Sequence, residues 1–107
     1  HPTGRVIKRR EPYKVDMDEL IKAAKKTRTI MEIDAYPERL DLRDEHIRKA
    51  VTAGIRFSID SDAHDISHFQ YLELGIAQAR RGWATKSDII NTRGWKEMFK
   101  QLKSAKI

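Results

Sequence analysis

The segment Ile55-Arg56-Phe57-Ser58-Ile59 is followed directly by Asp60-Ser61-Asp62-Ala63-His64. Apolar and polar residues alternate in the first half, which is typical of a β-strand. The second half predicts a loop in which Asp62 and His64 stand two positions apart. An extended loop of this kind presents a carboxylate oxygen and an imidazole nitrogen on the same side, where both can reach one metal ion. The pattern therefore predicts a strand that ends in a metal-binding loop.

A second strand is predicted upstream, over residues 28–35. Apolar side chains at positions 31 and 33 alternate there with Glu32 and Asp34, so both carboxylates are expected on one face of the strand. Two interpretations stay open. The carboxylates are either metal ligands or half-buried side chains that pair with Arg28 or Arg39.

Helices are predicted before, between and after these strands. The first begins with a capping box at Asp16 and Glu19 and ends near Thr27; the second runs from Asp41 to Gly54; the third begins with a capping box at Ser67 and Gln70 and ends at Gly82; the last follows Thr92 and places Trp95, Phe99 and Leu102 in the core. This alternation predicts an α/β fold with a parallel sheet. Two strands are too few for such a sheet, so we expect residues 1–107 to be part of a larger barrel.

The composition sets limits on partners and location. A chain of 107 residues has room for one small domain, and its net charge of +6 favours a polyanionic partner, although a thermostable surface rich in charged residues has a similar composition. Cysteine is absent, which excludes disulfides and thiolate metal sites. No apolar run approaches the ~20 residues that span a bilayer, and no signal peptide is visible. We therefore expect a cytoplasmic protein without a membrane partner.

A further candidate ligand is His1, in the segment His1-Pro2-Thr3-Gly4-Arg5. In parallel α/β folds the functional side chains gather at the carboxyl ends of the strands. We expect His1, Asp34, Asp62 and His64 to meet there, and the combination of imidazole and carboxylate suits zinc or manganese. A histidine in a Pro-Thr-Gly turn can instead be structural.

The two remaining histidines are interpreted differently. His46 lies among charged residues of a predicted helix and is expected at the surface. His68 stands at a predicted helix start, where a local hydrogen bond is more common than metal ligation.

The loop after His1 is rich in cations, namely Arg5, Lys8, Arg9, Arg10 and Lys14. A charge run of this kind is usually a solvated surface. Beside a metal site, however, arginine can hold phosphate oxygens in bidentate fashion, so Arg5 and Arg10 are expected to bind a phosphodiester. Trp83 and Trp95 could stack on bases, although Trp95 is more simply explained as a core residue.

Six stretches together resemble one known family. They are His1-Pro2-Thr3-Gly4-Arg5, Arg9-Arg10-Glu11-Pro12-Tyr13, Glu32-Ile33-Asp34-Ala35, Arg39-Leu40-Asp41-Leu42, Asp62-Ala63-His64, and Ala79-Arg80-Arg81-Gly82-Trp83 with Asn91-Thr92. The chain resembles the C-terminal half of the polymerase-and-histidinol-phosphatase (PHP) domain, in the version appended to bacterial and archaeal family X DNA polymerases. The resemblance spans nearly the whole chain in order.

This resemblance implies a distorted seven-stranded β/α barrel that holds up to three metal ions, usually zinc or manganese, and a 3′-5′ exonuclease or related phosphoesterase activity. It implies that His1, Asp62 and His64 are metal ligands. Asp34 stands where the family generally has asparagine after Glu-Ile. The family's opening His-x-His motif, the N-terminal half of the barrel and the polymerase domain have no counterpart in residues 1–107.

Three functions are consistent with these observations. The first is part of a metal-dependent phosphoesterase that acts on DNA. The second is a small-molecule phosphatase of the histidinol phosphatase branch, which the basic loop and the Arg-Arg-Gly-Trp ending argue against. The third is a non-catalytic nucleic-acid-binding module. Whichever holds, we expect residues 1–107 alone to have little activity, and an open sheet edge to favour self-association.

Overall fold

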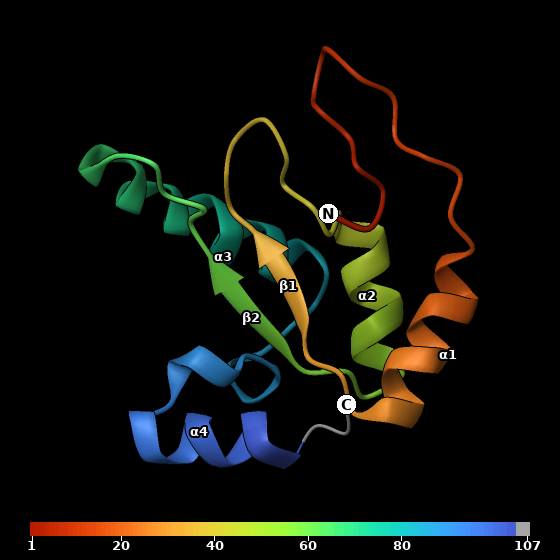
Figure 1. Cartoon of the computed structure of the whole chain (residues 1–107), viewed down its shortest axis with the longest axis vertical. Helices are drawn as coiled ribbons and strands as arrows, with labels where there is room; N and C mark the ends of the chain where they lie inside the picture. The colour runs from red at the N-terminus through yellow and green to blue at the C-terminus, as the bar shows by residue number, and fades with distance from the viewer. Residues whose placement is uncertain (105–107) are drawn as a thin grey trace.

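The chain folds as two parallel strands with helices around them (Figure 1). The computed structural model describes residues 1–104. Its elements in chain order are α1 (Met17–Thr27), β1 (Met31–Asp34), α2 (Asp44–Thr52), β2 (Phe57–Asp60), the 3-10 helix η1 (Ile66–Tyr71), α3 (Leu72–Arg81), the short 3-10 helices η2 (Lys86–Asp88) and η3 (Ile90–Thr92), and α4 (Trp95–Ser104). The α/β class is confirmed, and the complete seven-stranded barrel stays a prediction.

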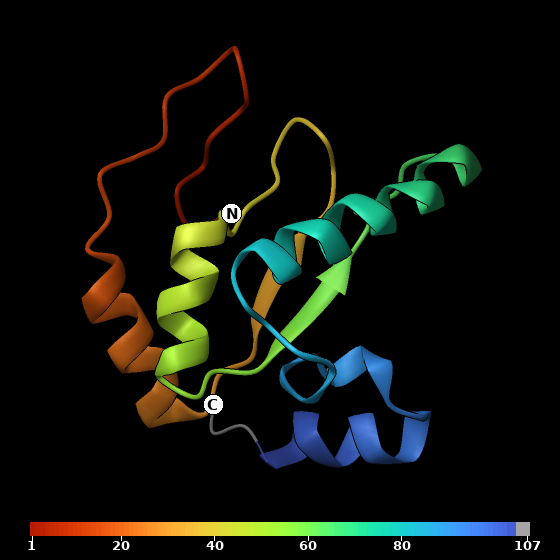
Figure 2. The same cartoon turned by 180° about the vertical axis from the view of Figure 1, so that it is seen from behind.

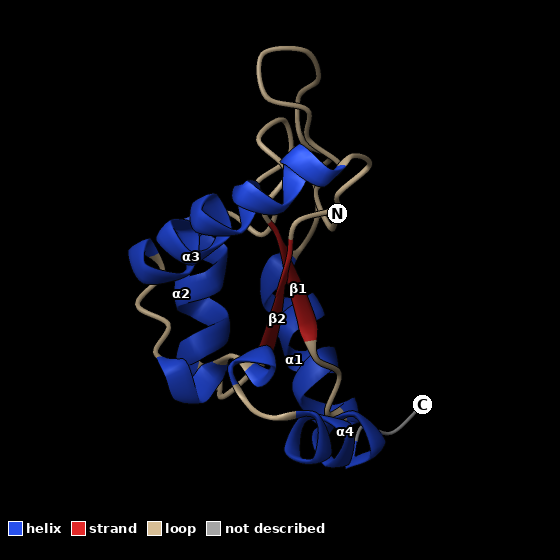
Figure 3. Cartoon of the chain, turned by 90° about the vertical axis from the view of Figure 1, so that its left-hand side faces the viewer, coloured by secondary structure: helices blue, strands red, loops and turns tan. Residues whose placement is uncertain are grey.

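The two strands pair in parallel, with Met31 opposite Phe57 and Asp34 opposite Asp60. Helix α3 packs against both strands, and α2 packs against α1 and α3. The strands point toward the loops at the top of Figure 1, where the N-terminal segment and the loop after β1 also lie, and η1 projects beyond the sheet (Figures 1 and 2). Helix α4 lies at the opposite end, near the start of the strands (Figure 3). The carboxyl ends of the strands therefore face the long loops.

The core forms where the strands meet these helices. Ile33 of β1, Phe57 of β2 and Ile47 of α2 are completely buried, and Leu42 joins them from the loop before α2. Side chains of this size each contribute about 1.5–3 kcal/mol when they are fully buried. The core thus fixes β1 against β2, and with them the residues at the strand ends.

Several local signals in the sequence are confirmed. The Asp16 carboxylate accepts a hydrogen bond from the Glu19 N–H at 3.1 Å, and α1 begins at the next residue. Helix α3 ends at Gly82, as predicted. Both strands exist but are shorter than predicted, because only four residues of each take part in the ladder.

Two predicted helix starts are wrong. Arg43 and not Asp41 stands at the N-cap of α2, because the Asp41 side chain is buried against Thr3 instead. The third helical segment begins two residues earlier than a cap at Ser67 implies, since Asp65 is the N-cap of η1 and accepts from the Ser67 N–H.

The predicted core role of the last helix is also wrong for the described part of the chain. Trp95 is 66% exposed, and Phe99 and Leu102 are 42% and 45% exposed. Their helical spacing is real, but none of the three belongs to the buried core cluster of the described residues. Within residues 1–104, no helix has both the length and the apolar character needed to cross a membrane.

Candidate metal centre

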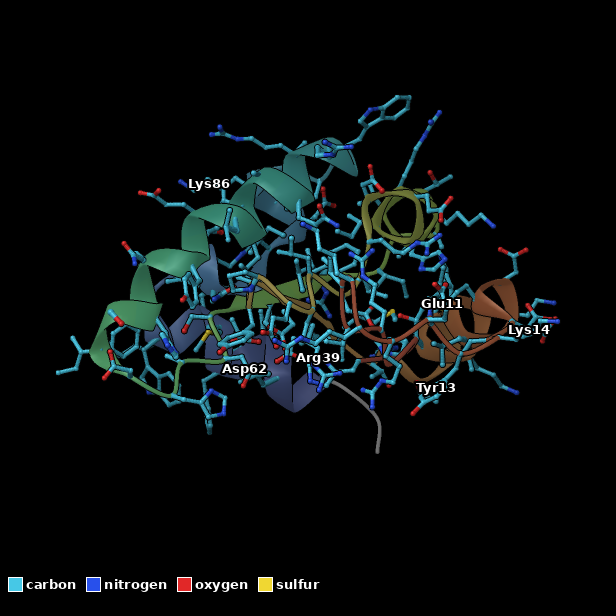
Figure 4. All side chains as sticks on the ribbon, turned by 90° about the horizontal axis from the view of Figure 1, so that it is seen from above. Glu11, Tyr13, Lys14, Arg39, Asp62 and Lys86 are labelled. Atoms are coloured by element: carbon cyan, nitrogen blue, oxygen red, sulfur yellow. The ribbon has the colours of Figure 1, made fainter. Side chains whose placement is uncertain are left out.

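Three predicted ligands meet at the carboxyl ends of the strands. His1, Asp34 and Asp62 each offer one ligand atom, and these atoms all lie within 4.8 Å of one another. His1 Nδ1 lies 3.4 Å from Asp34 Oδ2. Asp34 is buried, whereas His1 and Asp62 are exposed, so the group is open to solvent on one side. In the view onto this end of the molecule, Asp62 lies near the middle of the picture, beside Arg39 (Figure 4).

The backbone explains why Asp34 and Asp62 converge. Asp34 is the last residue of β1 and stands opposite Asp60, the last residue of β2. The ladder continues for one more hydrogen bond, from the Ala35 N–H to the Asp60 carbonyl at 2.7 Å. Asp62 then adopts a positive φ of 55°, a conformation that aspartate tolerates better than most residues. This sharp turn comes immediately beyond the strand pair, where Asp62 reaches Asp34.

His1 is held in place by a buried contact two residues later. The Thr3 N–H and Oγ1 both donate to Asp41 Oδ2, at 3.2 and 2.9 Å. Thr3 is 3% exposed and Asp41 is 1% exposed, so the contact is shielded from water. The Gly4 N–H donates to the His1 carbonyl at 3.1 Å, which closes a turn around Pro2. The Thr3–Asp41 contact therefore anchors the segment that carries His1.

The surroundings of Asp34 disfavour the ionised form of its carboxyl group. Burial raises the pKa of Asp34 from 3.8 to about 6, and the neighbouring Asp62 carboxyl adds to this effect. The Tyr36 N–H donates to Asp34 Oδ1 at 2.8 Å and works in the opposite direction. Carboxylates that are crowded in this way are stabilised by a cation between them.

Glu32 belongs to a second carboxylate pair beside the first. The pKa of Glu32 is raised from 4.5 to about 7, mainly by burial. Its hydrogen bond to the Asp60 side chain and the charges of Asp60 and Asp34 also raise it. Glu32 therefore shares an electrostatic environment with Asp34. Asp60 was not predicted as a site residue, although its place at the end of β2 is a signal that could have identified it.

The donor set fits a divalent cation. One imidazole and two carboxylates are ligands that zinc and manganese accept, and no thiolate is needed. Three protein ligands leave coordination positions for solvent or a substrate oxygen. His1, Asp34 and Asp62 are therefore the residues that would hold the ion.

His64 is not part of this three-residue group as the described residues place it. Its side chain is exposed, and its ring centroid lies 5.9 Å from that of Tyr36 in an edge-on contact. The His64 N–H donates to His68 Nδ1 at 3.0 Å, so the local hydrogen-bonding role predicted for His68 is confirmed. His46 is half-buried rather than fully at the surface, and its Nδ1 has no hydrogen-bond partner within the described residues.

The two arginines expected to bind phosphate are engaged with the backbone. The Arg5 guanidinium donates to the carbonyls of Arg39 and Leu40. Arg10 Nε donates to the Gly4 carbonyl at 2.9 Å, and its guanidinium lies 6.0 Å from the centre of the Tyr13 ring. Arg5 thus joins the N-terminal segment to the loop after β1, a structural role that its sequence position did not reveal.

No protein-family model matches the chain. A search of curated proteins gives a clear relative: 103 residues, 96% of this chain, are 44% identical to the "DNA polymerase/3'-5' exonuclease PolX" of Bacillus subtilis (strain 168). This chain is related to PolX, a family X DNA polymerase. The resemblance recognised in the sequence is thereby confirmed. The chain spans 18% of the length of PolX.

Proposed function

We propose that residues 1–107 form part of a PHP-type phosphoesterase domain that acts on DNA in a PolX-like polymerase. The observation that carries this proposal is the meeting of His1, Asp34 and Asp62 at the carboxyl ends of two parallel strands. The printed name of the relative, a DNA polymerase with 3′-5′ exonuclease activity, supports a DNA phosphodiester as the substrate.

Each residue of the candidate metal centre has its own role in the proposed function. Asp34 and Asp62 supply negative charge for a divalent cation, and His1 supplies a neutral nitrogen donor. Held by these residues, a divalent cation would supply a bound water of lowered pKa and would neutralise charge on a phosphoryl oxygen. The Tyr36 N–H and the Thr3–Asp41 contact keep two of these ligands in place. His64 and Glu32 are expected to complete the set in the larger barrel.

The N-terminal loop supports a polyanionic substrate. Lys8, Arg9 and Arg10 are exposed, and in Figure 1 the loop stands at the end of the molecule to which the strands point. Contacts to phosphate release counterions, so DNA affinity is expected to fall steeply with salt. Replacing these three residues with alanine is expected to reduce that salt dependence.

Metal binding is the direct test of the proposal. We expect Mn²⁺, followed by electron paramagnetic resonance, to bind the purified chain, and Asp62→Asn to weaken binding at least tenfold. Glu73→Gln on the exposed surface of α3 is the matched control, because it removes one negative charge from a residue outside the ligand group and should leave binding unchanged. Equal Mn²⁺ affinity for the wild-type chain and Asp62→Asn would reject the site.

Hydrolysis is a separate measurement. With only the three ligands of this group, the chain alone is expected to cleave single-stranded DNA slowly or not at all, even when it binds Mn²⁺. Cleavage of a small phosphate monoester in preference to DNA would favour a phosphatase instead.

A further inference from the structure

A group of aromatic rings lies next to the candidate metal centre. The rings of His68 and Tyr71 are stacked, with centroids 5.0 Å apart and an interplanar angle of 23°. The Tyr36 ring stands edge-on to both of them, at centroid distances of 5.5 Å. We call Tyr36, His68 and Tyr71 the aromatic group.

The backbone ties this group to the metal centre. Tyr36 follows Asp34 by two residues, and its N–H holds Asp34 Oδ1 at 2.8 Å. Beyond the end of β2, His64 follows Asp62 by two residues, and its ring lies 5.9 Å from the Tyr36 ring. The segments where the two strands end therefore carry the carboxylates and lead into the rings.

The aromatic group is not part of the hydrophobic core. Each of its three side chains is only half-buried, and none belongs to the buried cluster around Ile33 and Phe57. The segment η1, which carries His68 and Tyr71, projects from the sheet (Figure 2), and both side chains remain partly exposed.

We propose that the aromatic group is a stacking site for an unpaired nucleobase of the DNA strand whose phosphate lies at the metal centre. This inference rests on the proposed function and adds a base-binding site to it. A nucleotide carries its base next to its phosphate, which matches a ring stack beside a cation site. Stacking on an aromatic face tolerates any base, so the site holds single-stranded DNA without reading its sequence.

The test compares two oligonucleotides of equal length. One is a fluorescently labelled oligo(dT), and the other has the same backbone with abasic sites. Their affinities for the chain are measured by anisotropy in EDTA, so that metal binding does not enter the result. We expect the dT strand to bind at least fivefold more tightly, because stacking of one base on an aromatic ring typically raises the affinity by about fivefold or more. Salt should weaken the binding of both strands equally and leave the ratio of their two affinities unchanged, since only phosphate contacts release counterions.

Variants test whether the aromatic group causes this ratio of affinities. Tyr71→Leu should bring it close to one without changing affinity for the abasic strand, and Tyr71→Phe should restore it. Trp95→Leu is the matched control, because this exposed ring belongs to α4, at the opposite end of the molecule from the metal centre (Figure 3). Equal affinities of the wild-type chain for both strands, or an equal loss in Trp95→Leu and Tyr71→Leu, would overturn the inference.

Two further measurements keep the outcomes distinct. If Tyr71→Leu fails to fold, nuclear Overhauser contacts between the thymine methyl groups and the Tyr71 ring in the unmodified chain decide the question, and their absence overturns the inference. Mn²⁺ binding reports on the proposed function separately. A chain that binds Mn²⁺ but does not distinguish the two strands retains the metal centre and loses the base site.

Discussion

Asp34 is the residue whose replacement best separates stability from function. It is 1% exposed, and burial together with Asp62 raises its pKa from 3.8 to about 6. We expect Asp34→Asn to stabilise the metal-free chain at pH 8, because asparagine cannot ionise. Its side-chain oxygen can still accept the Tyr36 N–H, and its amide can donate to the Asp62 carboxylate.

The pH dependence has a definite sign. The unfolded chain releases the Asp34 proton near pH 3.8 and the folded chain near pH 6, so the folded state binds more protons between these values. The free energy of unfolding of the wild-type chain therefore falls as pH rises through this interval. The free energy of unfolding of Asp34→Asn does not fall in this way. Its gain in stability over the wild type is therefore absent near pH 4 and complete by pH 8.

The size of the effect follows from the pKa change. A change from 3.8 to about 6 corresponds to roughly 3 kcal/mol without screening, at about 1.4 kcal/mol for each pH unit. Solvent reaches His1 and Asp62, so we discount this to about 1–2 kcal/mol. At an m-value of about 2 kcal/mol/M, the urea midpoint at pH 8 should rise by roughly 0.5–1 M.

The assay is urea unfolding followed by circular dichroism, in EDTA, at pH 4 and pH 8. Glu73→Gln on the surface of α3 is the charge-matched control and should stay within about 0.5 kcal/mol of the wild type. An Asp34→Asn variant less stable than the wild type at pH 8 would refute the reasoning. It would mean that attraction between His1 and Asp34, 3.4 Å apart, outweighs the cost of burial. With saturating Mn²⁺ the order should reverse, since the ion stabilises the form that binds it.

Three further outcomes are expected. Thr3→Val should weaken Mn²⁺ binding, and Thr3→Ser should restore it, because the hydroxyl that Asp41 accepts anchors the His1 segment; a valine variant with wild-type affinity would contradict this. Gly82→Ala should lower the free energy of unfolding by about 1–3 kcal/mol in urea melts, since the new methyl group meets Ile47. At Gly94 the described residues leave room for a methyl group, so Gly94→Ala should lower it by less than about 1 kcal/mol. The exposed face of Trp95 should promote self-association, seen as a concentration-dependent sedimentation coefficient that Trp95→Ser reduces.

Some parts of the fold follow from neighbouring residues and could be predicted. The Asp16 cap, the end of α3 at Gly82 and the capping box between Thr85 and Asp88 are all local interactions. The two caps depend on side chains that reach the backbone a few residues away. The sequence contains all the information that such contacts need.

Other parts depend on contacts between distant residues. An aspartate before a helical pattern predicts a cap, yet Asp41 instead accepts from Thr3, 38 positions away in the sequence. The stripe that contains Trp95 predicts a buried face, yet burial requires a partner surface that the described residues do not supply. Periodicity identifies an apolar face but not what covers it.

The metal centre combines both kinds of information. Strand patterns place Asp34 and Asp62 near the ends of two strands, but their meeting requires that Asp34 stand opposite Asp60. A shift of one residue in this register would turn the Asp34 side chain to the other face of the sheet, away from Asp62. The positive φ at Asp62 then decides which side chain of the Asp62-Ala63-His64 loop approaches Asp34, and in this structure it is Asp62. The sequence could therefore name the candidate ligands, whereas the membership of the group depends on strand register and on one backbone angle.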